Sequence, residues 1–278
     1  MASYRFRSKE SIDIELTESG QPIISRDGKR VMYATLPTAN KVELWVSDID
    51  GNNKVRIATA DSHDEDLLTL NWAPDNLHLF FSQGPKVYMV GADGSGLRQL
   101  PSMGGMTISN ALWSRDQKSV YVSTLESTGP MPAHTVWRWT EGSTPEKLVE
   151  NCGYIYDAHP REDYLLSLHD SGIYQVDISK RKCIPLLLHV GTSGAIFASD
   201  GKSFLYAVNS RGQISIYRQQ WKDGKLIGTP QIALELPFTF SLGYGYYGGV
   251  SYDFSRDLST IVFCRTGGHA ELYLMNPS

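Results

Sequence analysis

The densest group of chemically capable side chains in this sequence lies between Asp61 and Asp66, with the residues DSHDED. Clustered carboxylates can ligate Ca²⁺ or attract a basic partner. The spacing and the glycine of an EF-hand loop are missing, however, and His63 alone does not define a metal site. His63, Asp64, Glu65 and Asp66 are therefore candidate binding residues, and a solvated surface loop is the alternative interpretation.

Aromatic side chains gather in a second segment, from Tyr244 to Gly249 (YGYYGG). Amphipathic rings beside flexible glycines are typical of sites that recognise a peptide or the face of a sugar. Tyr244, Tyr246 and Tyr247 are therefore further binding candidates. The alternative is that this segment only fills the mouth of a channel.

Sequence signatures of catalysis and of cofactor binding are missing. There is no G-x-S-x-G nucleophile elbow, P-loop, H-E-x-x-H motif or dinucleotide fingerprint. Four histidines fall in different parts of the chain, so each is expected to be structural: His134, His169, His189 and His269. We predict no catalytic residue, no metal site and no cofactor.

The three cysteines are an odd number without metal-like spacing: Cys152, Cys183 and Cys264. A free cysteine usually behaves as a small buried hydrophobe, so we expect structural thiols.

Composition excludes several classes of partner. The net charge of −4 gives no electrostatic case for nucleic acid, and no apolar run reaches the 18 residues that a membrane span needs. The first residues, MASYRFRSKES, lack the apolar region of a signal peptide. This favours a cytoplasmic protein for the chain as written, or an extracytoplasmic one if the chain is an excised receptor or periplasmic domain.

The elements that would position these candidates repeat along the chain. The unit is clearest from Trp72 to Leu100, where the turn cluster at 73–76 (APDN) and the pair Asp93-Gly94 separate apolar runs. Equivalent turn residues recur 39 to 57 residues apart: Asp27, Asp75, Asp116, Arg161, Asp200 and Asp257. Four residues after each of them stands a large apolar one: Val31, Leu79, Val120, Leu165, Phe204 and Ile261.

Four strands in a repeat of about 40 to 50 residues are typical of a β-propeller blade. The sequence therefore predicts an all-β fold, a single domain over residues 1–278 with six blades of four antiparallel strands. The last repeat has no room for its outer strand, whereas the alternating segment Ile12 to Leu16 precedes the first turn. We expect this N-terminal strand to complete the last blade and to close the ring. Trp72 and Trp113, which precede their turns, are expected to pack between blades.

The repeat resembles that of the TolB-like six-bladed propeller family. The resemblance is carried by W-[AS]-[PR]-D at Trp72 to Asp75 and Trp113 to Asp116, by the run LWVSDIDG from Leu44 to Gly51, and by Arg98 to Leu100. The segment Tyr252 to Ser259 also resembles propeller modules fused to bacterial receptor-like serine/threonine kinases. The fourth repeat departs from the pattern, with His159-Pro160-Arg161. The resemblance implies a binding or sensing module with a protein partner.

Irregular loops on a rigid scaffold usually carry binding. The connections between blades, and between second and third strands, are long and irregular and share one face: 36–40, 60–66, 101–110, 126–135, 151–156, 191–194, 237–249 and 265–270. The proline-rich part at 127–134 is not expected to pair as a strand. We predict a monomeric, non-catalytic module that binds a protein, a peptide or a small ligand on this face. The alternative is a propeller enzyme of the lyase or glycosidase type with its active site in the axial channel.

Overall fold

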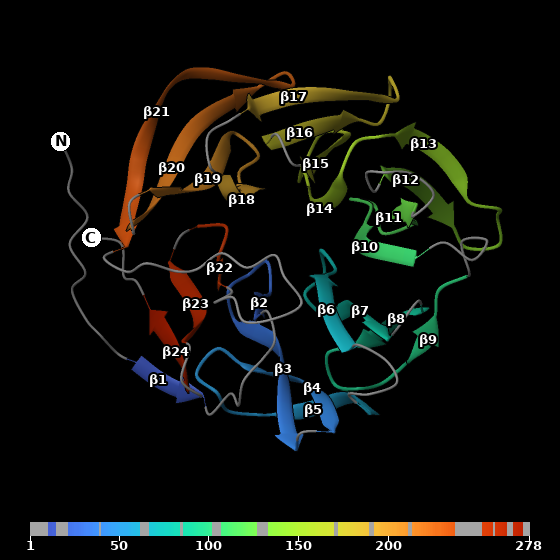
Figure 1. Ribbon diagram of the computed structural model, residues 1–278, viewed down its shortest axis with the longest axis vertical. Coiled ribbons are helices and arrows are strands. Elements are labelled where there is room, and N and C mark those ends of the chain that lie inside the picture. The colour runs from blue at the N-terminus through green and yellow to red at the C-terminus, as the bar shows by residue number, and fades with distance from the viewer. Residues whose placement is uncertain are drawn as a thin grey trace. The chain divides into compact units, whose positions relative to one another are not determined.

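The computed structural model describes residues 11–14, 22–38, 40–61, 67–83, 86–101, 107–126, 133–169, 172–188, 192–210, 213–236, 252–257, 259–265 and 269–274. These residues form 24 strands in six four-stranded antiparallel sheets, which we number in chain order (Figure 1). None of them lies in a helix that could cross a membrane. The prediction of an all-β chain with four-stranded antiparallel repeats is confirmed.

The chain divides into two compact units, of which unit 1 comprises Met1–Leu100 and Phe240–Ser278. Its first sheet contains β2 (Ile23–Ile24), β3 (Arg30–Thr38), β4 (Lys41–Asp48) and β5 (Val55–Asp61). Its second sheet contains β6 (Leu67–Trp72), β7 (His78–Gln83), β8 (Lys86–Gly91) and β9 (Arg98–Gln99). The sixth sheet contains β22 (Tyr252–Phe254), β23 (Thr260–Arg265), β24 (His269–Leu274) and β1 (Ser11–Ile14).

Unit 2, Pro101–Thr239, holds the other three sheets. The third sheet contains β10 (Thr107–Trp113), β11 (Ser119–Glu126), β12 (Ala133–Thr140) and β13 (Glu146–Glu150). The fourth contains β14 (Tyr154–Ala158), β15 (Tyr164–His169), β16 (Gly172–Asp177) and β17 (Lys182–Leu188). The fifth contains β18 (Thr192–Phe197), β19 (Ser203–Ser210), β20 (Gln213–Lys222) and β21 (Lys225–Leu236).

Strands extend further into the predicted connections than expected. β3 runs to Thr38, β14 begins at Tyr154 and β18 begins at Thr192. The expectation that 127–134 cannot pair was wrong at its end, because Ala133 and His134 pair with Glu126 and Leu125. Strand pairing continues there because the prolines of this segment, at 130 and 132, stop just before β12.

Each sheet has two distinct ends. The turns between first and second strands and between third and fourth strands lie at one end, which we call the turn end. The links between second and third strands, and those that lead to the next sheet, lie at the other, the connection end. This follows from the antiparallel order of strands within each sheet.

The recurring aspartates act as predicted, as acceptors within the turns. Asp27, Asp116 and Asp257 each accept from the backbone amide two residues later, at 3.2, 3.1 and 3.0 Å. The residue that follows the aspartate adopts a positive φ in several turns, for example 58° at Asn76 and 62° at Gly201. Short polar side chains and glycine are the residues that tolerate this conformation.

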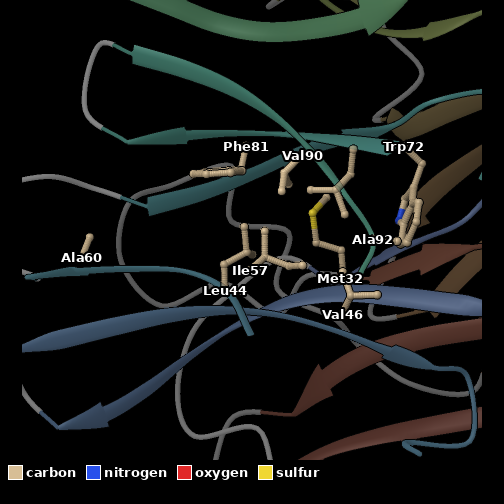
Figure 2. Close-up of a cluster of buried hydrophobic side chains, with 10 residues drawn as sticks. Met32, Leu44, Val46, Ile57, Ala60, Trp72, Phe81, Val90 and Ala92 are labelled. Atoms are coloured by element: carbon tan, nitrogen blue, oxygen red, sulfur yellow. The ribbon is translucent and has the colours of Figure 1, made fainter. Parts of the chain in front are cut away.

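The core consists of apolar side chains between neighbouring sheets. Figure 2 shows the cluster between the first and second sheets, which includes Met32, Leu44, Trp72 and Phe81. Trp72 is 1% exposed, and its indole Nε1 donates to the carbonyl oxygen of Ile23 at 2.9 Å. Trp113 is 9% exposed. Both tryptophans are therefore buried, as predicted.

Inner strands of successive sheets are also joined by a carboxylate. In unit 2, Asp157 Oδ2 accepts from the amide of Phe197 at 2.8 Å. In unit 1, Asp253 Oδ2 accepts from the amide of Ile24 at 2.8 Å, although the two residues are 229 positions apart. The two aspartates occupy equivalent places in their repeats, so the sixth sheet meets the first as the fourth meets the fifth.

β1 pairs with β24 from Ser11↔Tyr273 to Ile14↔Ala270, so the N-terminal segment supplies the outer strand of the sixth sheet. Deleting residues 1–16 is expected to expose the edge of β24 and to cause aggregation or a lower melting temperature, because an unpaired strand edge templates association. Light scattering and thermal unfolding measure both effects. Deleting only residues 1–10, which leaves β1 intact, is the control. A monomeric 1–16 deletion with an unchanged melting temperature would contradict the assignment.

Candidate functional site

The binding residues predicted from the sequence lie outside the described residues. These are His63, Asp64, Glu65 and Asp66 in the acidic run, and Tyr244, Tyr246 and Tyr247 in the aromatic run. They remain predictions. The described part of the connection end nevertheless holds a group of side chains that the sequence did not bring together.

Three rings stand in a row at the connection end of the third and fourth sheets. The imidazole of His134, near the start of β12, lies 6.0 Å from the ring of Tyr154, measured between centroids. Tyr154, the first residue of β14, lies 6.2 Å from Tyr156 on the same strand. The successive rings are tilted by 53° and 56°, so they form two shallow V-shaped contacts rather than a flat stack. We call His134, Tyr154 and Tyr156 the aromatic row.

The tyrosines of the aromatic row present carbon rather than oxygen. Tyr154 and Tyr156 are half-buried, yet both phenolic oxygens are buried. The exposed surface of these residues is therefore largely ring carbon. Tyrosine normally buries the ring and leaves the hydroxyl in water, so this orientation produces an apolar surface suited to stacking.

A covalent bond fixes the link that leads into the aromatic row. Cys152 and Cys183 form a disulfide that ties the segment before β14 to β17, the outer strand of the same sheet. The Cys152 amide donates to the carbonyl oxygen of His134 at 3.3 Å. The prediction of free structural thiols was wrong for these two cysteines, because folding brings residues 31 positions apart in sequence to a Cα separation of 5.7 Å.

Gly153 fixes the same link by having no side chain. Its φ is +74°, and a Cβ atom at this position would lie 2.0 Å from the carbonyl oxygen of Leu168. No other residue fits at such a distance from backbone. The disulfide and this close approach together hold Tyr154 in one place, which lowers the entropy that a ligand would have to remove on binding.

A second ring pair lies at the connection end of the fourth sheet. His169, the last residue of β15, packs edge-on against Tyr174 of β16 with centroids 5.8 Å apart. His169 is exposed and Tyr174 is half-buried. The fourth sheet thus offers rings from three of its four strands, β14, β15 and β16.

The turn end differs from the connection end, because its carboxylates accept hydrogen bonds within the turns. The Ser114 hydroxyl donates to Asp116 at 2.7 Å and, together with the amide of Lys118, holds the pKa of that carboxyl below its usual value. Arg115 donates to the carbonyl oxygen of Arg161. These polar groups are explained by the stability of the turns.

The side chains of the aromatic row are of types that suit binding. Its rings offer stacking surface, and a neutral imidazole adds one donor and one acceptor. Among the residues that the structure describes, no three His, Cys, Asp or Glu side chains gather as a metal site. Sequence reasoning missed the row because it treated His134 singly and placed 151–156 in a loop. The alternation of Tyr154 and Tyr156 was the available signal, since it is typical of a strand.

Comparison with known proteins bears on the fold. No family model and no curated protein matches this chain. TolB from Acinetobacter baumannii is 14% identical with a TM-score of 0.51; the match covers 74% of this chain and 55% of that one, so the chain spans about half the length of this relative. The structure of putative TolB from Agrobacterium tumefaciens is 16% identical with a TM-score of 0.57 over 86% of this chain and 91% of that one. The fold is a TolB-like β-propeller.

Propellers of other functions are equally similar to this chain. An oligogalacturonate lyase in complex with manganese is 11% identical, with a TM-score of 0.61 and coverage of 99% of this chain and 96% of the lyase. Identities at this level establish a shared fold and nothing further, because one fold supports many functions.

Proposed function

We propose that this chain is a non-catalytic binding module that engages a protein or peptide partner at the connection end of a closed, six-bladed, monomeric propeller. The aromatic row is the observation that carries the proposal. It combines apolar ring surface with a rigid support, and aromatic residues contribute a disproportionate share of interface energy. The sensing role implied by the resemblance to kinase-fused propellers belongs to the same proposal.

The contact between the sixth and first sheets supports ring closure. Asp253 bonds to the amide of Ile24 in the same manner as Asp157 bonds to that of Phe197. The last repeat therefore contacts the first as one repeat contacts the next along the chain. A closed ring buries the faces of every blade, which single repeats cannot do alone. On this ground we propose a single domain over residues 1–278.

A peptide fits the aromatic row better than a polar ligand does. Tilted rings about 6 Å apart are in contact with one another, so they offer their outer faces and edges to flat apolar groups such as prolyl or aromatic side chains. Sugars require several polar side chains around the ring face, whereas the phenolic oxygens here point away from the surface. We therefore propose an extended peptide segment as the part of the partner that contacts Tyr154.

Selection of a phage-displayed random peptide library on the protein tests this function. Selected peptides should bind Tyr154→Ala at least about 30-fold more weakly, as expected for loss of an interface anchor worth about 2 kcal/mol. Leu97→Ala is the control, because Leu97 is 55% exposed near the turn end of the second sheet. Failure to enrich peptides, or binding lost in Arg115→Ala and retained in Tyr154→Ala, would overturn the proposal.

The acidic and aromatic runs predicted from sequence are proposed as binding residues in their own right. Tyr246→Ala and Tyr247→Ala should weaken peptide binding without lowering the melting temperature. Asp64→Ala should instead slow association and reduce its dependence on salt, because rim charges act mainly on encounter. Equal affinity and equal association rates in all three variants would remove these residues from the site.

A further inference from the structure

The fourth repeat lacks the turn aspartate and replaces it with a histidine. Arg161 stands where the other repeats have Asp. His159 performs the missing function, since its Nδ1 accepts from the backbone amides of Arg161 at 3.1 Å and Glu162 at 2.8 Å. The other ring nitrogen, Nε2, lies 3.0 Å from the carbonyl oxygen of Gly201 in the turn of the fifth sheet. One imidazole therefore shapes its own turn and also joins two sheets.

These contacts determine the protonation state of His159. Both partners of Nδ1 are N–H donors, so Nδ1 must carry a lone pair. The partner of Nε2 is a carbonyl oxygen, so Nε2 must carry the hydrogen. A second proton on Nδ1 would face two donors and break both of their hydrogen bonds. The folded turn thus requires the neutral imidazole.

The surroundings of the ring do not favour a charge either. His159 is 2% exposed and packs edge-on against Phe197 at 4.5 Å and near Trp221 at 5.8 Å. Gly201 leaves room for it, because a Cβ there would lie 3.0 Å from Cε1 of the imidazole. Moving a charge from water into such an apolar environment is costly.

Charged groups lie on the elements around His159. On the strand that leads to it, β14, the buried Asp157 accepts from the amide of Phe197 at 2.8 Å. On its own turn, Glu162 accepts from Trp221 Nε1 at 3.1 Å, and Arg161 is exposed. On the fifth sheet, Asp200 accepts from the amide of Lys202 at 2.8 Å and lies 3.8 Å from Arg218. The hairpin after Trp221 adds the exposed Lys222 and Asp223.

We propose that His159 is a pH-sensitive latch that holds the fourth and fifth sheets together when neutral and releases them when protonated. Tyr156 packs against the same cluster as Phe197 and Trp221, so release disturbs the aromatic row. The consequence for peptide binding rests on the proposed function, whereas the latch itself does not. Acidification below the ordinary histidine range, about pH 6.5, is the signal to which it responds.

The test compares urea unfolding at pH 7 and pH 5, followed by tryptophan fluorescence. If only the unfolded chain binds the proton, acidification from pH 7 to pH 5 should raise the equilibrium constant for unfolding of the native sequence. This rise should be about 25-fold larger than in a variant without the latch. The matched variant is His159→Ser with Arg161→Asp, which installs the Ser-x-Asp turn seen at Ser114 and Asp116, where the hydroxyl donates at 2.7 Å. A turn aspartate with a lowered pKa loses its contribution only below about pH 4, outside this window.

An equal rise in both proteins would overturn the proposal. If the double variant does not fold, His159→Asn keeps an acceptor near the position of Nδ1 and cannot titrate, so it should show the same loss of acid sensitivity. NMR titration of the native protein supplies an independent readout. A His159 imidazole that protonates near pH 6.5 while the protein stays folded would also refute the latch, whatever the outcome of peptide selection.

Discussion

Replacing Trp72 by alanine is expected to lower the free energy of unfolding by about 3 to 5 kcal/mol, because the indole fills the cluster between the first and second sheets. The ring is 1% exposed, and its Nε1 donor satisfies the carbonyl of Ile23 at 2.9 Å. Removing it leaves a cavity and an unsatisfied acceptor. Urea unfolding with linear extrapolation measures the loss.

Two further variants serve as references for the loss of stability expected of Trp72→Ala. Trp72→Phe keeps an aromatic ring in the cluster and should lose much less, since the missing hydrogen bond contributes about 1 kcal/mol. Leu97→Ala alters an exposed apolar side chain and should change stability by less than about 0.5 kcal/mol. A loss below about 1 kcal/mol for Trp72→Ala would mean that the ring is not packed between sheets.

Replacing Gly153 by alanine is expected to be similarly damaging, at about 3 kcal/mol or more. A left-handed conformation alone costs an alanine about 1 to 2 kcal/mol. The added Cβ would also meet the carbonyl oxygen of Leu168 at 2.0 Å, so the backbone of β15 or of the linking segment must move. Either movement displaces Tyr154, so peptide affinity should fall together with the free energy of unfolding.

Gly142 supplies the matched control for this prediction. Its φ of +77° is close to that of Gly153, but no atom lies within 4 Å of its Cβ position. Gly142→Ala should therefore show only the conformational cost, and peptide affinity should stay unchanged. Thermal unfolding and peptide binding of the two variants, measured side by side, separate strain from collision. Equal losses in both variants would show that the close approach to Leu168 does not matter.

The repeat could be predicted from sequence because its residues act locally. A turn aspartate accepts from an amide two residues later, and the alternation of apolar side chains defines each strand, so neither requires distant parts of the chain. The burial of Trp72 and the pairing of the N-terminal segment followed from the same regularity. The turn aspartate recurs in five of the six repeats, and repetition distinguishes it from chance.

The disulfide, the aromatic row and the histidine latch were decided by the tertiary structure. Cys152 and Cys183 gave no signal in a set of three cysteines, because pairing depends on the distance between β17 and the segment before β14. Tyr154 meets His134 only when the third and fourth sheets are adjacent. At His159 the sequence showed a broken motif, and only the fold supplied Gly201 as the partner of Nε2. Interactions within each repeat determine its turns and strands, whereas contacts between repeats depend on packing that no single repeat encodes.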